Sequence, residues 1–248
     1  HSEPNPKEQR WTTPEGKAMI RSSCAKELHS LVTDTKAWIP VDLERSRELR
    51  TSVPDRILRP RPVLTLRHDD EGVEEVKCRC TLQGFKDPDI LDLVRQGRTA
   101  SPTLSTNGRA LILQLIASCR FHMTIGDVKS AFLMADREDR PNGPIYVTMP
   151  KDYVMEGMHP EQLFEVRNGY GLGDQPQQWW RTFERYMVDE LGFVQHPMDP
   201  CVFMLREPVP PGREQDIPRD RISVIREAQD GKNDHLRGEP GTLCGILG

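Results

Sequence analysis

The sequence lacks the features that would place it in a membrane or mark it for secretion. It has no run of about 18 apolar residues, so no transmembrane helix is expected. Its N-terminus has no basic segment followed by an apolar one, so no secretion signal is expected either. Because the first residue is His1 rather than Met, we expect an internal piece of a longer chain.

An excess of basic residues is also missing. The formal net charge is -4 and the isoelectric point is near 6.0. Proteins that bind nucleic acid usually have a basic balance or a basic face, so the bulk charge argues weakly against such a partner. It does not exclude a local basic channel, because binding depends on where the lysines and arginines lie.

The cysteines show no metal-binding spacing. None of them forms a Cys-x-x-Cys pair, and no histidine pair has zinc spacing. Cys78 and Cys80 are two residues apart, which places both on one face if the segment is a strand. We therefore predict free, buried thiols in a reducing compartment. The six are Cys24, Cys78, Cys80, Cys119, Cys201 and Cys244.

The organisation of the chain indicates an α+β protein. Its mean hydropathy of -0.62 and its 21 prolines indicate a loop-rich globular chain without internal repeats. Strands and helices are expected without regular alternation, which favours the α+β class. We divide the chain into a polar tail (1–12), a main region (13–206), a charged, proline-rich insertion or loop (207–240) and an apolar strand start (241–248).

The first half of the main region predicts a helix, a loop and a hairpin. Thr13 and Pro14 are typical of a helix start, and apolar residues at helical spacing extend the helix to about residue 36. Several prolines predict loop or extended structure over 37–62. Residues 63–66 and 76–82 predict a β-hairpin.

The second half predicts a helix that starts at Ser101 and Pro102, with a buried apolar stretch over 110–119. A strand over 121–127 is expected to end at Asp127. A helix over 175–191 is expected to stop at Gly192. The remaining expected strands are 145–149, 163–166 and 201–205, the last preceded by a turn at residues 199–201.

Several blocks, in order, resemble the reverse transcriptase domain of copia-type retrotransposons. The match that resembles the family most is Asp127-Val128-Lys129-Ser130-Ala131-Phe132-Leu133, which looks like the first catalytic motif. The other similar blocks are 26–31, 35–38, 76–85, 100–102, 170–172 with Pro176 and 178–179, 191–193 and 199–203. Together they span about residues 17 to 206. The resemblance implies a partial right-hand fold, with fingers and an incomplete palm.

By this resemblance the parent is an RNA-directed DNA polymerase that uses two divalent ions, Mg²⁺ with Mn²⁺ as an alternative. Asp127 would be a catalytic residue and the first metal ligand, with the carbonyl of Val128 assisting. Hard ions of this kind take oxygen ligands. The alternative for Asp127 is a strand-terminal carboxylate that caps the next turn.

The resemblance also implies a substrate-binding set. Arg79, and less directly Lys77, would contact the incoming triphosphate, since a guanidinium can hold phosphate oxygens in pairs. Phe132 would pack under the sugar and exclude a 2′ hydroxyl. Tyr170 and Gly171 would line the nucleotide pocket. The alternatives are an exposed strand cation, a core phenylalanine and a simple glycine turn.

Two departures from the family pattern stand out. Gly173 and Gln175 occupy positions where a lysine and a serine are usual. The aromatic-x-Asp-Asp motif is absent, and no Asp-Asp pair follows Asp127. One aspartate cannot hold two ions, so this chain is expected to lack polymerase activity by itself. The alternative is a degenerate, non-catalytic remnant with at most nucleic-acid binding.

The partners implied by the resemblance are an RNA or DNA template with its primer, and deoxynucleoside triphosphates. The rest of a Pol polyprotein, with integrase and ribonuclease H, is also implied, and no membrane partner is expected. The expected location is intracellular, in a cytoplasmic particle or the nucleus.

Overall fold

The computed structural model describes residues 11, 13–68, 72, 74–121, 123–150, 153 and 155–205. The chain divides into two compact units. Unit 1 combines residues 1–100 with 130–179, and unit 2 combines 101–129 with 180–248. The predicted insertion and strand start, 207–240 and 241–248, lie outside the described residues. Among the residues that are described, no helix has the length and apolarity to cross a membrane.

Unit 1 begins with the predicted amphipathic helix. Helix α2 (Pro14–His29) continues as the π-helical turn η1 (Ser30–Asp34), close to the expected 14–36. The Thr13 hydroxyl accepts a hydrogen bond from the Gly16 N–H at 3.1 Å, which caps the first turn. Cys24, Leu28 and Leu31 are buried on one stripe of this helix.

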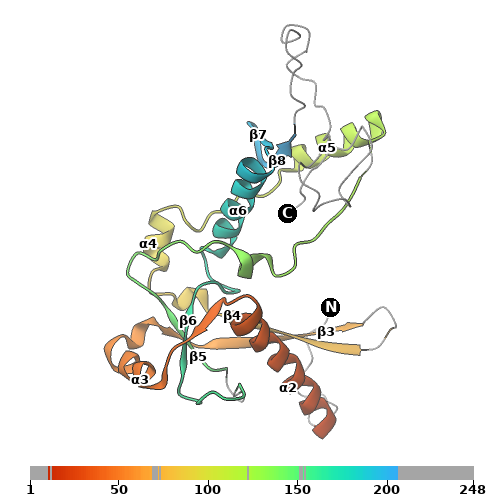
Figure 1. Cartoon of the computed structure of the whole chain (residues 1–248). Coiled ribbons are helices and arrows are strands. Elements are labelled where there is room, and N and C mark those ends of the chain that lie inside the picture. Colours follow the sequence, from red (N-terminus) through yellow and green to blue (C-terminus); the bar gives the residue numbers. More distant parts are fainter. Residues whose placement is uncertain are drawn as a thin grey trace. The chain divides into compact units, whose positions relative to one another are not determined.

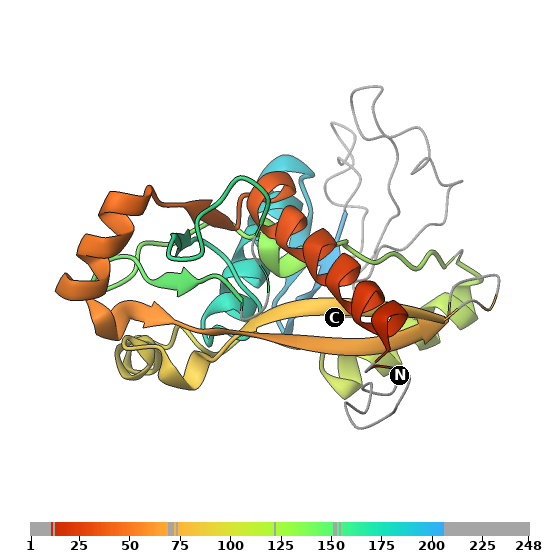
Figure 2. The same cartoon turned by 90° about the horizontal axis from the view of Figure 1, so that it is seen from below.

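The predicted hairpin is confirmed. Strands β3 (Pro60–His68) and β4 (Glu74–Leu82) pair antiparallel, with Pro60 opposite Leu82 and His68 opposite Glu74 (Figure 1). Proline inside β3 is tolerated because a two-stranded sheet leaves this strand at an edge. Figure 2 shows α2 (red) lying obliquely across the long hairpin.

The free edge of β4 is closed by side chains of α2 and by one backbone carbonyl. The Cys78 N–H donates to the Ser23 hydroxyl at 2.8 Å, and the Cys80 N–H donates to the Glu27 carboxylate at 3.1 Å. The Leu82 N–H donates to the Tyr170 carbonyl at 2.7 Å. An unpaired strand edge invites association with other chains. These three bonds satisfy the edge and fix α2 against β4.

A short mixed sheet completes unit 1, with strand order β1-β6-β5-β2. Its strands are β1 (Trp38–Pro40), β2 (Ile57–Leu58), β5 (Tyr146–Thr148) and β6 (Leu163–Val166). β2 pairs parallel with β5, and the other two pairs are antiparallel. The sheet, α2 and β4 share one buried core, in which the Trp38 and Phe164 rings lie 5.9 Å apart. The strands predicted at 145–149 and 163–166 are confirmed.

The expected loop over 37–62 is wrong in part. It contains helix α3 (Leu43–Ser52), whose first turn is capped by the Asp42 carboxylate accepting from the Arg45 N–H at 2.9 Å. The prolines act only after this helix, beginning with the short η2 (Pro54–Arg56).

Unit 1 also contains η3 (Gly84–Lys86) and α4 (Ile90–Arg95), which were not predicted, and a buried residue, Trp11, ahead of the predicted helix start. Trp11 belongs to the segment that we expected to be a polar tail. Its side chain is buried against Leu66 and Val76 of the hairpin. A large aromatic ring removed from water in this way extends the folded region beyond the predicted start at residue 13.

In unit 2, helix α5 (Thr106–Cys119) differs from the prediction in two ways. It starts after Ser105, not at residue 101, and the Ser105 hydroxyl caps it by accepting from the Gly108 N–H at 2.9 Å. It is also not a buried helix: within α5 only Ile112 is buried, while Leu111 and Leu113 are 56% and 43% exposed.

The C-terminal part of unit 2 follows the prediction for its helix and its last strand, whereas strand β7 (Val194–His196) was not predicted. Helix α6 (Gln175–Arg185) starts in unit 1 and leads into the π-helical η5 (Tyr186–Glu190), with Gly192 at φ +71 just beyond. Strands β7 and β8 (Asp199–Met204) form a hairpin. The turn predicted at 199–201 is wrong by two residues: the chain turns at 197–198, and β8 already begins at Asp199. The Asp199 carboxylate accepts from the Cys201 N–H at 3.0 Å and from the Ser105 hydroxyl at 2.6 Å, which fixes the start of the strand.

Unit 1 also contains a buried network of charges that the sequence did not suggest. The Arg140 side chain is 6% exposed and pairs with Asp87, with Asp89 at 3.1 Å and with Asp174 at 3.5 Å. Arg56 makes a two-pronged contact to Asp89 at 2.7 and 3.0 Å. The Arg140 and aspartate side chains of this network are almost fully removed from water, so leaving any one of these charges unpaired would be costly.

This network predicts a specific dependence of stability on pH. Burial would raise the pKa of Asp89, but hydrogen bonds from Arg56, Asn142 and Arg140 lower it to about 2. A carboxylate whose folded-state pKa lies below its ordinary value of about 3.9 stabilises the protein above that value. This contribution is lost as the pH falls from about 4 toward about 2.

Asp89→Asn should therefore flatten the dependence of the free energy of unfolding on pH in this acidic window. The measurement is urea denaturation of the wild type and of Asp89→Asn at several pH values between about 2 and 7. Asp92→Asn is the matched control, because Asp92 is 42% exposed, pairs with the exposed Arg95 and accepts a long hydrogen bond from Asn142 at 3.4 Å. An unchanged slope in Asp89→Asn would contradict the role given to this carboxylate.

Candidate functional site

Three of the predicted substrate residues come together in unit 1. The Arg79 guanidinium of β4 lies over the Tyr170 ring, 5.8 Å from its centroid. The Phe132 ring meets Tyr170 edge-on, with 6.5 Å between centroids. Phe132 belongs to the short 3-10 helix η4 (Ala131–Met134). We call these residues the Arg79–Tyr170–Phe132 cluster; they come from three separate segments of the chain.

The backbone places Tyr170 beside β4. Tyr170 forms an isolated parallel bridge with Thr81 and accepts the hydrogen bond from Leu82 described above. Gly171, the next residue, has φ +91, and a Cβ there would collide with the Leu82 carbonyl oxygen. A Cβ on Gly84 would collide in turn with the Gly171 carbonyl oxygen. The segment that follows β4 and the segment around Tyr170 thus approach so closely that glycine is required at both positions, 84 and 171.

The outer face of the hairpin is cationic. In the strand register, the charged residues that alternate with the buried ones on β3 and β4 are the cations Arg61, Arg67, Lys77 and Arg79 and one acid, Glu75, which lies opposite Arg67. Burial and the neighbouring charges of Arg67 and Arg79 lower the pKa of Lys77. We call the four cations the cationic hairpin face. The negative net charge of the chain did not exclude a local basic surface, and this face is such a surface.

Two residues that had no predicted role, Glu27 and Ser130, also belong to this site. Burial raises the pKa of Glu27, against the effects of the Cys80 N–H and of the charges on Arg79 and Lys77. Its carboxylate therefore lies within the field of the cationic face. Burial likewise raises the pKa of Tyr170, and a hydrogen bond with the Ser130 side chain lowers it to a lesser extent. The phenol thus stays protonated at neutral pH.

The available sequence signal for Glu27 was its spacing. Ser23 and Glu27 lie one helical turn apart and reach successive free N–H groups of β4. Ser130 has φ +56, a left-handed conformation that sequence alone does not reveal.

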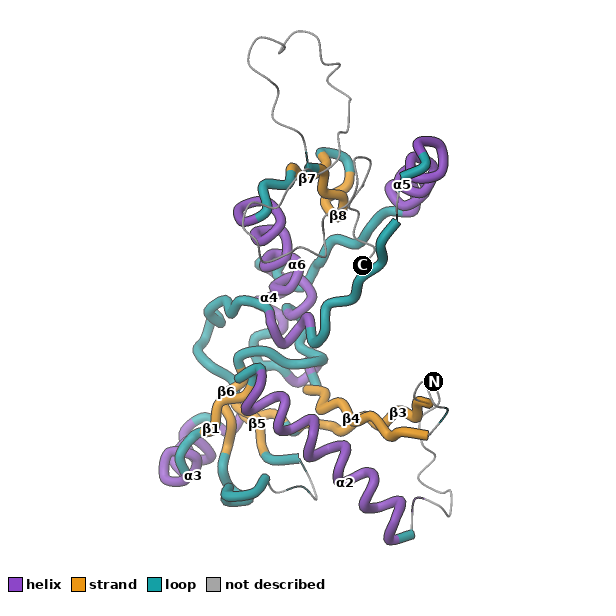
Figure 3. The backbone as a smooth tube through the Cα atoms, turned by 45° about the vertical axis from the view of Figure 1, so that its right-hand side comes forward, coloured by secondary structure: helices purple, strands orange, loops and turns teal. Residues whose placement is uncertain are grey.

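Asp127 and Val128 belong to unit 2, whereas the Arg79–Tyr170–Phe132 cluster belongs to unit 1. The strand expected over 121–127 is wrong for the described part of that segment, which Figure 3 draws as loop after α5. The Asp127 side chain is exposed, and Val128 is 49% exposed. A strand forms when its backbone groups pair with a neighbour, and no described strand pairs with this segment.

The described residues do not fit the two-ion centre that the resemblance implies. A pair of ions needs several oxygen ligands held together. In the described ranges no group of three or more His, Cys, Asp or Glu side chains could hold a metal ion. Asp127 and the Val128 carbonyl are thus too few ligands, and no chemical step is derived through a metal here.

One departure from the family pattern has a structural explanation. Gln175 is 1% exposed, and its side-chain amide donates to the Phe132 carbonyl at 2.8 Å and accepts from the Gly169 N–H at 3.0 Å. It therefore connects the segment of Phe132 with the segment of Tyr170. At Gly173, a Cβ would lie 2.7 Å from the Ile90 side chain, so a larger residue needs that side chain to move.

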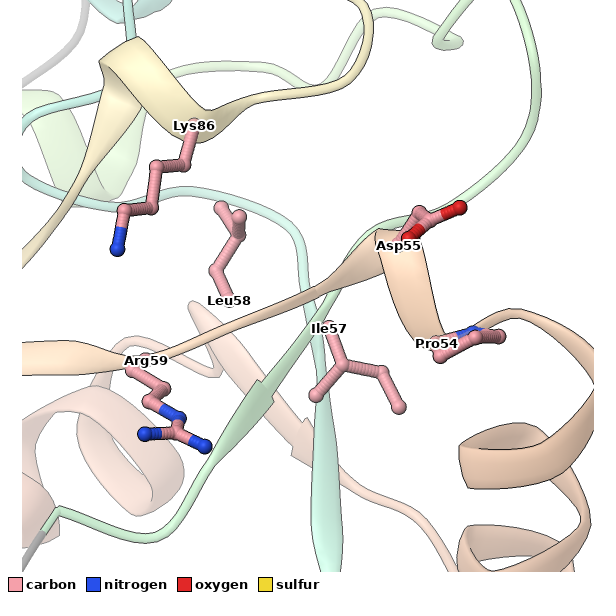
Figure 4. A pocket seen from close by; sticks show the side chains of 6 residues that line it. All are labelled: Pro54, Asp55, Ile57, Leu58, Arg59 and Lys86. Carbon is pink, nitrogen blue, oxygen red and sulfur yellow. The ribbon is translucent and has the colours of Figure 1, made fainter.

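A separate shallow hollow of about 220 Å³ lies beside β2 (Figure 4). It is lined by Pro54, Asp55, Ile57, Leu58, Arg59 and Lys86. None of the predicted site residues lines it. Its two cations are partly offset by one carboxylate, so its charge is weaker than that of the cationic hairpin face.

Comparison with known proteins gives one informative similarity. The chain is 28% identical over 152 residues to the retrovirus-related Pol polyprotein from transposon TNT 1-94 of Nicotiana tabacum. The match covers 61% of this chain and 11% of that protein, so the chain spans only a small part of its relative. No model of a protein family matches the chain. No solved structure matches it either.

Proposed function

We propose that this chain is a segment of the reverse transcriptase region of a copia-type Pol polyprotein, and that unit 1 contributes fingers-like contacts to nucleotides and nucleic acid. The observation that carries the proposal is the Arg79–Tyr170–Phe132 cluster. Residues chosen from separate sequence blocks lie in contact with one another. The similarity to a transposon Pol polyprotein supports the same family.

The chemistry of the cluster suits a nucleotide. The Arg79 guanidinium is held over an aromatic ring, which orients its planar fork without neutralising its charge. Such a fork binds phosphate oxygens in pairs. Lys77, two residues along the same strand face, adds a second positive charge for a polyphosphate.

The aromatic part of the cluster suits the sugar and the base. Phe132 remains 36% exposed although its carbonyl is fixed by Gln175. A half-exposed ring on a fixed backbone can stack against a ligand at a small entropic cost. Gly171 lets the backbone beside Tyr170 come close to whatever is bound.

We further propose that the 248 residues bind but do not polymerise. Asp127 has no second carboxylate within a metal-holding group in the described part of the chain, and the printed sequence contains no Asp-Asp pair after it. Deoxynucleoside triphosphates and a primed template are therefore ligands, not substrates, of this chain.

The test is binding of a fluorescently labelled deoxynucleoside triphosphate to the purified chain, measured by anisotropy at low salt. Arg79→Ala should weaken binding about 10-fold, equivalent to about 1.4 kcal/mol, because a charged phosphate contact is lost. Arg79→Lys should recover only part of this, since a point charge does not reproduce the fork.

Arg95→Ala is the matched control, because Arg95 is an exposed arginine on α4 whose side chain is 75% exposed. It should leave the affinity unchanged. Equal affinities for the wild type and Arg79→Ala would reject the site. Primer extension by the purified chain would reject the second part of the proposal.

A further inference from the structure

Two buried thiols from different elements of unit 1 face each other. The sulfur atoms of Cys24 on α2 and Cys78 on β4 are 2.7 Å apart. Both side chains are buried, with 1% and 2% exposure. Non-bonded heavy atoms of comparable kind pack at about 3.5–4.0 Å. The two sulfurs are therefore much closer than ordinary core packing requires.

The surrounding contacts hold this pair in place from both sides. Ser23, next to Cys24, accepts the hydrogen bond from the Cys78 N–H itself at 2.8 Å. One helical turn later, Glu27 accepts from the Cys80 N–H at 3.1 Å. The helix and strand that carry the two thiols are thus joined directly at the thiol positions, which keeps the two sulfurs beside each other.

A third thiol, Cys80, is buried on the same face of β4 and is the competing partner. Residues two apart on a strand are separated by about 6.6–6.8 Å along the chain. That spacing is at the outer limit for a disulfide, whose Cα atoms usually lie about 4.4–6.8 Å apart. Cys24 is therefore the better partner for Cys78.

We propose that Cys24 and Cys78 are a modification site at which a peroxide forms an intramolecular disulfide between α2 and β4. The sulfur of one cysteine attacks a peroxide oxygen, the O–O bond breaks, and a sulfenic acid and one water result. The sulfur of the other cysteine then attacks the sulfenic sulfur and releases a second water. Two thiols are oxidised to one disulfide, and hydrogen peroxide is reduced to two waters.

The environment sets the rate of this reaction. The thiolate is the attacking species, and the contact with Cys78 together with burial raises the pKa of the Cys24 thiol above its usual range. Oxidation of the folded protein is thus slow at neutral pH and faster at alkaline pH or when α2 opens locally. In a reducing compartment the pair stays as two free thiols, which is the form that the structure shows.

The cross-link would act on the neighbourhood of the cationic hairpin face. Cys78 lies between Lys77 and Arg79 in β4, so a bond to α2 would fix the strand that carries both cations. It would also close a loop between residues 54 positions apart. Such a closure constrains the unfolded chain, and we expect a rise in melting temperature on the order of 5–10 °C.

The experiment uses the full 248-residue chain, reduced, freed of reductant and incubated with hydrogen peroxide at mildly alkaline pH. The protein is then denatured in acid, remaining thiols are alkylated, and peptides are mapped by mass spectrometry without reduction. We expect one cross-linked peptide pair that joins Cys24 to Cys78, and a higher melting temperature that dithiothreitol reverses.

Variants separate this pair from its neighbour. Cys80→Ser should keep the cross-link and the temperature shift, whereas Cys24→Ser and Cys78→Ser should lose both. Full alkylation of Cys24 and Cys78 after treatment, a dominant Cys78–Cys80 link, or only intermolecular dimers would each overturn the proposal. Because the mapping is done on the wild type, poor folding of a variant leaves the decision intact.

Discussion

Replacing Arg140 with leucine is expected to lower the free energy of unfolding by about 3–5 kcal/mol, because removing one partner of a buried ion pair leaves an uncompensated charge. Here the loss is shared by Asp87, Asp89 and Asp174, which are 0%, 1% and 1% exposed. Arg56 still reaches Asp89, so that carboxylate keeps one partner. The measurement is chemical denaturation of the full 248-residue chain, followed by tryptophan fluorescence.

Two control variants make the Arg140 result interpretable. Arg95→Leu removes an arginine that is 75% exposed and should change the stability by no more than about 0.5 kcal/mol. Arg140→Lys keeps the charge but loses the planar fork, so an intermediate cost is expected. If Arg140→Leu were as mild as Arg95→Leu, the network would not be the stabilising element described here.

Gly171→Ala should be strongly destabilising. The residue has φ +91, where an alanine is strained by about 1–3 kcal/mol. The added Cβ would also strike the Leu82 carbonyl oxygen and lie 2.7 Å from the Thr81 methyl group. Backbone cannot give way as a flexible side chain can, so we expect a total loss above about 3 kcal/mol or failure to fold.

Gly97→Ala is the matched control for this substitution. Gly97 has φ +67, but a Cβ there meets nothing within 4 Å. Its cost should therefore reflect the left-handed backbone alone, about 1 kcal/mol. Similar costs for the two variants, compared by thermal unfolding, would show that the approach of residue 171 to β4 is looser than described.

The elements predicted correctly are those whose signal is local. Thr13 and Pro14 mark the start of α2, and Gly192 follows the end of η5, because capping groups act within one turn. The hairpin of β3 and β4 followed from two short runs of strand-forming residues. Helix α3 was not predicted although Asp42 is a typical N-cap residue. The prolines at 54, 60 and 62 restrict the backbone only after this helix, but the prediction extended their effect over the whole segment.

The errors concern properties that depend on distant residues. The apolar composition of α5 was taken to mean burial, yet Leu111 and Leu113 are largely exposed. The strand expected to end at Asp127 needs a neighbour to pair with, and the sequence of the strand alone does not supply one. Composition and periodicity describe an element, whereas burial and pairing belong to its surroundings.

The candidate site shows the same division. Arg79, Phe132 and Tyr170 were chosen individually by resemblance, and their mutual contact is seen only in the folded unit. Glu27 lies in the similar block 26–31 but had no assigned role, because its contact with β4 depends on how α2 packs. The Arg140 network was missed entirely, since its partners lie far apart in the sequence.

The discontinuity of unit 1 has a consequence for synthesis on the ribosome. Strands β1 and β2 appear early in the nascent chain, but their partners β6 and β5 are made about a hundred residues later. The first hundred residues therefore emerge with α2 and the hairpin able to form locally, while the short sheet must wait for residues up to 166. Ribosome pausing between residues 100 and 166 would lengthen the period in which Trp38 and its neighbours are exposed to chaperones.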